Sequence, residues 1–387
     1  MPLIILRPLR KVEVALPSSL QDTPTYPVHI FDLVDTLMLW QSLFIDGNDM
    51  RVVFEIGPTL YSLETAIQLA DTSKEANADA VKVQMLNPDD LLINKDLKFD
   101  YLQLNEDYST ANRSELLYDI LERRYLTDNE WEVFFNHCSD IGISVFATVT
   151  NHHYIALARS LGAKELKIAS ADITYLDLIE GAARTGLPVH LDTGRASLNE
   201  ISEAIGIVKA NGSGNLVVHY CPPGYPASIE DVHLEILTFL REEFNVAVGY
   251  SDHSPGVNFN IVAIALGADI IEKTLTFSRT SNGPEHMFSI EVSEAKSFVE
   301  TLRSIDFVTQ KRSSNITELF SENPSKLMRR SLYASRDVEV GATLQAADVV
   351  ACRPGTYLEP SELTGLLGRV TNQRIAKGSP LRLELFS

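Results

Sequence analysis

Between residues 51 and 310, apolar runs of strand length end in polar residues eight times, and a helix-like stretch follows each of them. An α/β chain with this alternation closes into a parallel (β/α)8 TIM barrel, and the carboxyl ends of its strands meet at one mouth. We therefore expect one candidate active site built from residues that are distant in sequence. The polar strand ends are Glu55, Lys82, Gln84, Thr148, Lys167, Ser170, Asp192, Thr193, Gly194, His219, Ser251, Asp252, His253, Glu272 and Lys273.

The rest of the chain lacks this alternation of strand-like and helix-like runs. We interpret residues 1–50 as an N-terminal extension of unclear role, residues 51–310 as the barrel, and the polar stretch 311–325 as a linker. Residues 326–387 carry short β-like runs and turn signals, which predict a small β-rich module. Within the barrel, a polar insert at residues 85–125 separates the second strand from its helix, and inserts of this length are often lids or binding loops.

Composition excludes several classes of protein. The chain has 33 Lys and Arg against 52 Asp and Glu, a formal net charge of −19, and nucleic-acid binding needs a basic surface instead. No stretch reaches the roughly 20 apolar residues that cross a bilayer. The three cysteines have no paired spacing, which fits a reducing compartment. We predict a cytoplasmic protein that binds neither nucleic acid nor membrane.

Several motifs, taken in order, resemble the sialic acid synthase family, which includes synthases of legionaminic and pseudaminic acids and spore-coat polysaccharide proteins. The barrel motifs are FEIG, NADAVKVQ, KIASADIT, TGRASLNEI, GYSDHSPG, IEKTLT and GPEH. The tail resembles the antifreeze-like (SAF) module of these synthases through RRSLYASRDVEVGATL, CRPGTYL and LLGRVTNQRIAKGSPL. The resemblance covers about residues 51–387.

The resemblance implies a reaction and its partners. Phosphoenolpyruvate condenses with the open-chain aldehyde of an N-acylated hexose, which gives a 2-keto-3-deoxy sugar acid and phosphate. Members of the family use a divalent metal, Mn²⁺ or Mg²⁺, to polarise the aldehyde oxygen. They are homodimers in which the tail of one subunit caps the barrel of the other.

The resemblance also assigns roles to residues. Catalytic positions match Glu55, Lys82, Lys167 and His253. Phosphoenolpyruvate-binding positions match Lys82, Thr148, Lys167, Ser170 and Ser251, whose ammonium and hydroxyl groups suit an anion. Sugar-binding positions match Glu55, Gln84, Asp172, Tyr225, Glu285 and Arg353. Alternatives exist for the charged members, because a lysine in an apolar strand or an exposed arginine is also explained by an ion pair with a carboxylate.

Two departures from the family's pattern affect the site. The family's metal has two histidine ligands, of which this chain keeps His253 and has Thr274 in place of the other. Threonine is a poor ligand for such an ion, which argues against the usual metal. Asp192 replaces a serine near the phosphate, and its carboxylate would need a cation such as Arg195 beside it.

Three functions follow from these residues. The first is an active synthase with an altered sugar acceptor. The second is a catalytically altered member that binds a sugar phosphate or serves in polysaccharide assembly. The third is a barrel aldolase that forms a Schiff base through Lys167 or Lys273.

Overall fold

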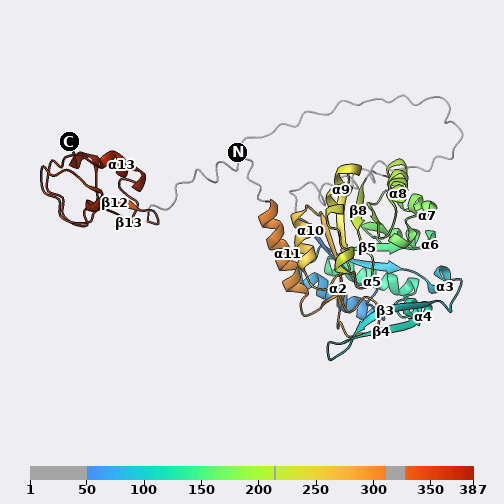
Figure 1. Cartoon of the computed structure of the whole chain (residues 1–387). Coiled ribbons are helices and arrows are strands. Elements are labelled where there is room, and N and C mark those ends of the chain that lie inside the picture. Colours follow the sequence, from blue (N-terminus) through green and yellow to red (C-terminus); the bar gives the residue numbers. More distant parts are fainter. Residues whose placement is uncertain (1–49, 213–214, 311–326) are drawn as a thin grey trace, which may run out of the picture. The chain divides into compact units, whose positions relative to one another are not determined.

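The computed structural model describes residues 50–212, 215–310 and 327–387. The predicted linker 311–325 lies outside the described residues, and so does the predicted N-terminal extension except for Met50. The chain divides at residue 310 into two compact units, and each is described by itself (Figure 1).

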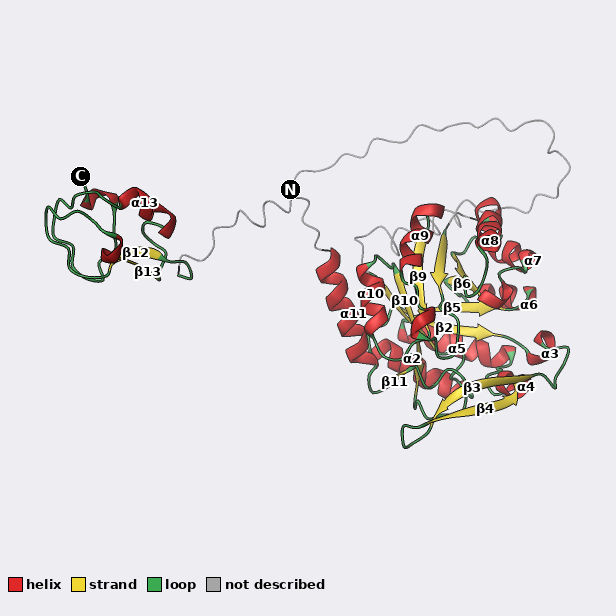
Figure 2. Ribbon diagram, in the orientation of Figure 1, coloured by secondary structure: helices red, strands yellow, loops and turns green. Residues whose placement is uncertain are grey.

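The first unit is a closed barrel, as predicted. Its parallel strands follow the order β1-β2-β5-β6-β7-β8-β9-β10, and β10 pairs with β1 to complete the ring. Figure 2 shows the strands surrounded by helices. The eight barrel strands are β1 (Arg51–Glu55), β2 (Ala80–Met85), β5 (Ser144–Val149), β6 (Glu165–Ile168), β7 (Val189–Asp192), β8 (Leu216–Tyr220), β9 (Ala247–Asp252) and β10 (Ile270–Thr276). The short β11 (Ile290–Glu291) pairs with the end of β10.

A helix follows each barrel strand along the chain and packs its apolar face on the ring. The eight helices are α2 (Leu63–Glu75), α5 (Asp128–Ile141), α6 (His152–Ser160), α7 (Leu176–Ala183), α8 (Leu198–Asn211), α9 (Glu235–Phe244), α10 (Asn258–Ala265) and α11 (Ala295–Gln310). Local sequence fixes several of their ends. Thr127 and Ser197 accept hydrogen bonds from backbone N–H groups in the first turns of α5 and α8, and the left-handed Gly142 ends α5.

The interior of the ring is only partly apolar. Successive strand residues face opposite sides, so every second residue points into the barrel. One small apolar cluster lies there, formed by Val53, Ala80, Phe146, Val217 and Ile270. Many other inward residues are charged or polar and almost completely buried. Because a buried charge without a partner is costly, these groups must pair with one another.

The insert predicted at residues 85–125 has structure of its own. It contains α3 (Pro88–Leu91), β3 (Lys98–Leu104), β4 (Thr110–Leu116) and α4 (Leu117–Glu122). Strands β3 and β4 form an antiparallel hairpin. Phe99 of the hairpin lies edge-on to the ring of Tyr225, with centroids 6.4 Å apart, and the Gln103 amide donates to Asn282 Oδ1 at 3.0 Å. The insert therefore reaches the loops that follow β8 and β10.

The second unit is small and irregular. Strands β12 (Ser331–Ala334) and β13 (Val349–Cys352) pair antiparallel, and α13 (Leu363–Leu366) is its short helix. Residues 368–375 form only single bridges, to Val338, Thr343 and Phe386. Leu332, Leu344 and Leu381 lie at the centre of the unit's own hydrophobic core. In the part of the chain that the structure describes, no helix has the length and apolar character needed to cross a membrane.

Candidate active site

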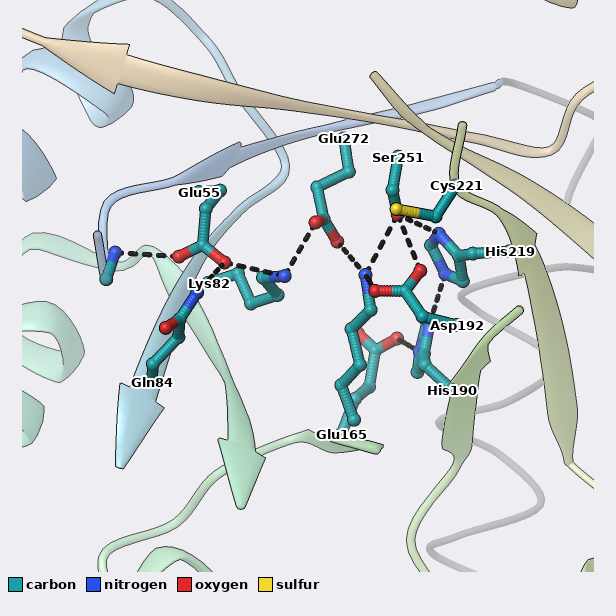
Figure 3. Close-up of polar contacts among 12 residues, drawn as sticks. Glu55, Lys82, Gln84, Glu165, His190, Asp192, His219, Cys221, Ser251 and Glu272 are labelled. Atoms are coloured by element: carbon teal, nitrogen blue, oxygen red, sulfur yellow. Dashed lines mark hydrogen bonds and ion pairs between the residues drawn. The ribbon is translucent and has the colours of Figure 1, made fainter. Parts of the chain in front are cut away.

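Two lysines from different strands meet at one carboxylate inside the barrel. Lys82 of β2 and Lys167 of β6 place their Nζ atoms 2.6 and 2.7 Å from Oε1 and Oε2 of Glu272 on β10. All three side chains are buried. Figure 3 shows Lys82 and Glu272 at the centre of a chain of polar contacts. The ammonium groups predicted to share one anion therefore face a common point.

The Lys167 ammonium group has three polar partners. It donates to Ser251 Oγ at 2.9 Å and to Glu272 Oε2 at 2.7 Å, and it forms an ion pair with Asp192 Oδ2 at 2.8 Å. Ser251 in turn donates to Asp192 Oδ1 at 2.9 Å. The cation that compensates Asp192 is thus Lys167 and not Arg195, which is exposed.

Glu55 forms the other end of the cluster. Its carboxylate lies 2.6 Å from Lys82 Nζ, and it accepts from the Gln84 amide at 3.2 Å and from the Gly57 N–H at 2.7 Å. The last contact requires a tight turn directly after β1. A side chain at Gly57 would lie 2.8 Å from the Glu55 carboxylate, so glycine is needed there.

A second line of contacts extends deeper into the barrel. The His219 ring lies 3.1 Å from Ser251 Oγ and 2.9 Å from the ring of His190. His190 contacts Glu165 at 2.6 Å, and Glu165 holds Arg51 through two hydrogen bonds of 2.5 and 2.9 Å. The site at the mouth is therefore joined to an ion pair well inside the ring.

The charges of the cluster stabilise one another. Burial opposes ionisation of Glu272, but the attraction of Lys167 and Lys82 outweighs it and lowers the pKa of Glu272 below its ordinary value. Burial likewise opposes the charged form of Lys82, but the carboxylates of Glu272 and Glu55 raise its pKa well above the usual value. Burial and the nearby Lys167 lower the pKa of His219 well below its ordinary value. At neutral pH Lys82 is a cation and His219 is neutral.

The predicted hydroxyl groups lie at the strand ends near the lysines. Thr148 is next to Lys167 in the pairing of β5 with β6. Its buried Oγ1 has no hydrogen-bond partner among the described residues. Ser170 follows β6 and lies against Gly194, where a Cβ atom would come within 2.6 Å of the serine Oγ. Asp172, two residues later, has a pKa raised by burial, and its carboxylate forms no ion pair or hydrogen bond with the lysine cluster among the described residues.

A pocket of about 420 Å³ opens between the loops that follow β6, β7, β8 and β9. Ser170, Gly194, Cys221, Tyr225 and His253 are among the residues that line it. The Tyr225 ring packs on the His253 ring at 4.7 Å. Of the predicted residues, Ser170 from the phosphoenolpyruvate set and Tyr225 from the sugar set line this pocket, together with His253.

The residues around His253 do not fit a metal held by several protein ligands. Its ring contacts Cys221 Sγ, which lies 3.7 Å from Nδ1. The adjacent Asp252 carboxylate is 2.7 Å from Lys273, and Thr274 is buried in β10. In the described ranges, no three His, Cys, Asp or Glu side chains group in a way that could hold a metal ion. Burial lowers the pKa of His253 to about 4, so the imidazole is neutral.

The two lysines named for a Schiff base are both engaged. Lys167 donates to Ser251 and Glu272 and pairs with Asp192, as described above. Lys273 contacts Asp252 and the carbonyl of Ser254 and has no exposed surface. A Schiff base needs an amine with a free lone pair that faces the substrate. These contacts do not favour that chemistry.

Glu285 lies in the loop after β10. Its nearest cationic neighbour is Arg124, with 3.9 Å between Nη1 and Oε1. Burial raises the pKa of Glu285 to about 7. The positive charge of Arg124 acts to lower this pKa, and the negative charge of Glu55 acts to raise it. Arg353, the remaining predicted sugar contact, is an exposed residue of the second unit.

Some residues of the site were not assigned from the sequence. Glu272 was noted at a strand end without a role, yet it joins the two lysines. Glu165 and His190 were not named, although each stands two residues before a noted polar residue on the same strand, and such residues face the same side. That spacing was the available signal. Arg124 had no comparable signal in the sequence, because it lies in a polar insert and not on a barrel strand.

Comparison with known proteins identifies the family of the chain. Residues 69–313 match the NeuB family and residues 329–387 match the SAF domain. The N,N'-diacetyllegionaminic acid synthase of Legionella pneumophila is 32% identical over 327 residues, which cover 83% of this chain and 90% of that protein. The pseudaminic acid synthase of Helicobacter pylori is 30% identical over 80% of this chain and 89% of that protein.

A solved structure is also similar. The sialic acid synthetase of Leptospira borgpetersenii superposes with a TM-score of 0.61 at 27% identity, over 71% of this chain and 91% of that one. The chain belongs to the NeuB family. It is a carbon–carbon bond-forming enzyme of the sialic acid synthase type.

Proposed function

We propose that the protein condenses phosphoenolpyruvate with the aldehyde of an N-acylated hexose or a related sugar, and releases phosphate and a sialic-acid-like 2-keto-3-deoxy acid. One observation carries this proposal: the ammonium groups of Lys82 and Lys167 converge on Glu272 at 2.6 and 2.7 Å. The buried, unpartnered Thr148 hydroxyl on the neighbouring strand end supports it. Two cations with a free hydroxyl suit a phosphate or carboxylate.

In the proposed reaction, carbon 3 of phosphoenolpyruvate forms a bond to the aldehyde carbon, and the aldehyde oxygen takes up a proton. Water adds at carbon 2 and loses a proton, and the bond from carbon 2 to the phosphate oxygen breaks. Lys82, Lys167, Thr148, Ser170 and Ser251 hold the phosphate and carboxylate.

The remaining residues of the proposal act on the sugar side. Glu55, fixed by the Gly57 N–H and the Gln84 amide, handles the proton of the acceptor. Gln84, Asp172, Tyr225, Glu285 and Arg353 contact the sugar. His253 packs on Tyr225 and, as a neutral imidazole, orients this side of the pocket.

We further propose a cytoplasmic homodimer in which the tail brings Arg353 to the partner's barrel. The guanidinium of Arg353 is exposed on its own unit, which supports a contact with something outside that unit. The free cysteines Cys138, Cys221 and Cys352 fit a reducing compartment.

The test is a phosphate-release assay with phosphoenolpyruvate and a panel of aldehydes derived from N-acylated hexosamines, with the product mass measured in parallel. We expect phosphate only when an acceptor is present, and a product mass equal to acceptor plus pyruvate. Lys82→Ala should raise the KM for phosphoenolpyruvate at least about tenfold, because a charge-assisted contact is lost.

The alternatives give different results in the same assay. A member that only binds would show phosphoenolpyruvate binding by calorimetry without phosphate release, which would contradict the proposal. An aldolase that uses a Schiff base would be modified by borohydride in the presence of substrate, and the proposal expects an unmodified mass. Paired reactions with EDTA and with added Mn²⁺ report whether turnover depends on a metal.

A further inference from the structure

Arg124 is a nearly buried cation whose hydrogen-bonding capacity is largely unused. Only 13% of its side chain is exposed. Its Nε–H is buried and has no hydrogen-bond partner among the residues that the structure describes. Its ion contact, to Glu285, spans 3.9 Å, which is longer than a hydrogen bond. A buried donor without a partner is costly, so a ligand is a natural explanation.

The neighbouring arginine shows what a structural role looks like in the same segment. Arg123 Nη1 donates to Glu115 Oε2 at 2.6 Å and so ties the residues after α4 to the hairpin. Within the described residues, Arg124 makes no side-chain hydrogen bond of this kind. The two arginines come from the same turn but are used differently, and Arg124 keeps only the longer contact with Glu285.

The position of Arg124 places its guanidinium on the acceptor side of the site. Glu285 lies close enough to Glu55 and Lys82 for their charges to act on it. Tyr225, which lines the pocket, is likewise within the electrostatic reach of both Glu285 and Arg124. Arg124 therefore lies next to Glu285, one of the proposed sugar contacts.

The chemistry of the group suggests what it holds. A guanidinium presents its N–H bonds in a planar fork that matches a planar group with one or two oxygen atoms. It has no acceptor and does not lose its proton, so the ligand must supply oxygen lone pairs. The raised pKa of Glu285 leaves this carboxyl partly protonated near neutrality, so Glu285 does not fully neutralise Arg124.

We propose that Arg124 binds a planar, oxygen-bearing substituent of the acceptor sugar, a carboxylate or an acyl carbonyl, and thereby selects the acceptor. This inference rests on the proposed function, because it assigns a residue to the acceptor of that reaction. Arg124 belongs to the barrel unit itself, so this contact does not depend on where Arg353 lies.

The experiment compares wild type, Arg124→Gln and Arg124→Lys in two measurements. The first is calorimetric binding of three non-reactive sugar alcohols, one with an N-acyl group, one with a carboxylate and one with neither. The second is the KM of the matching aldoses in phosphate release. The wild type should bind at least one of the two substituted sugars at least about tenfold more tightly than the plain one, and Arg124→Gln should lose that preference.

Arg124→Lys keeps the positive charge but loses the planar fork of N–H bonds. If this variant also loses the preference for substituted sugars, the planar shape of the guanidinium is what recognises them. The preferred substituent distinguishes the two kinds of acceptor. A preference for the carboxylate indicates an acidic acceptor sugar, and a preference for the acyl group indicates a neutral one. Arg123→Gln is the matched control, because it removes an equal charge from a partnered residue, and it should keep the wild-type preference.

Two results would overturn the inference. One is an Arg124→Gln protein that keeps the wild-type preference for substituted sugars. The other is an equal loss of binding affinity for all three sugars in both Arg124→Gln and Arg124→Lys. That result would mean that Arg124 has a structural role. Because binding is measured without turnover, a protein that shows the preference but releases no phosphate would remove the proposed function and leave the role of Arg124 standing.

Discussion

Three polar side chains surround the Lys167 ammonium group within 2.9 Å. Its three partners are Glu272, Asp192 and Ser251. A donor phosphate that approaches Lys167 must displace one of them, and the Asp192 carboxylate also repels it. Asp192 therefore competes with the donor for the same cation.

Replacing Asp192 with serine should free one N–H bond of Lys167 and remove the repulsion. We expect Asp192→Ser to lower the KM for phosphoenolpyruvate roughly tenfold, the scale of one charge-assisted hydrogen bond. Steady-state phosphate release checks this. Asp177→Asn is the control, because Asp177 is an exposed residue of α7 that contacts only His152 at the surface. An unchanged or higher KM in Asp192→Ser would show that the carboxylate assists the donor.

The buried carboxyl of Glu285 predicts a pH dependence of stability. Its pKa is about 7 in the folded protein, against an ordinary value of 4.5. Folding therefore takes up a proton between these values, and this group's contribution to stability falls as the pH rises toward 7. Below the ordinary value both states are protonated, and the contribution is constant.

The glutamine of Glu285→Gln cannot ionise, so the stability of this variant should not fall in this pH range through this group. We expect the free energy of unfolding of the variant, minus that of the wild type, to increase by on the order of 2 kcal/mol from pH 5 to pH 8. Urea unfolding at the two pH values measures it. A difference that stays constant with pH would show that the carboxyl is not destabilised by burial.

At the scale of elements, neighbouring strands must leave room for the polar side chains inside the ring. Gly249 of β9 lies against His219 of β8, and a Cβ atom there would come within 2.4 Å of the imidazole. His219 is completely buried and joins Ser251 to His190. The ring cannot move without breaking one of these contacts.

Gly249→Ala should therefore destabilise the barrel by about 1–3 kcal/mol, the usual cost of overpacking. Gly206→Ala is the matched control, since Gly206 lies mid-helix in α8 with no atom near its would-be Cβ, and alanine there should stabilise by up to about 1 kcal/mol. Chemical unfolding of both variants gives the comparison. Equal stability of Gly249→Ala and wild type would contradict the close packing of His219.

At the scale of the whole molecule, the proposed dimer makes each site depend on two subunits. Lys82→Ala damages the barrel part of the site, and Arg353→Ala damages the tail part. If the tail caps the partner's barrel, a mixed dimer of the two variants contains one intact site. Refolding an equal mixture should then recover roughly a quarter of wild-type activity, because half of the dimers are mixed and each has one good site.

The phosphate-release assay on separate and co-refolded variants measures this recovery. Each variant refolded alone is its own control and should stay impaired. A co-refolded mixture no more active than the average of the two would mean that the tail acts on its own barrel or not at all.

Much of the fold could be predicted from the sequence because its signals are local. Apolar runs of strand length, the capping residues Thr127 and Ser197, and the stop signal at Gly142 each act within a few residues of the chain. Repetition of this pattern then leaves few architectures other than the barrel. The ends of the strands also indicated Glu55, Lys82, Lys167 and Ser251 as neighbours.

What the sequence by itself determined was the alternation of elements, the family resemblance and the set of polar residues at the barrel mouth. Only the tertiary structure decided their contacts: Glu272 lies between the two lysines, Asp192 lies on Lys167, and the Nε of Arg124 has no hydrogen-bond partner among the described residues. The physical reason is that hydrogen bonding and burial depend on distances across strands and loops far apart in the chain. Local propensity does not encode those distances.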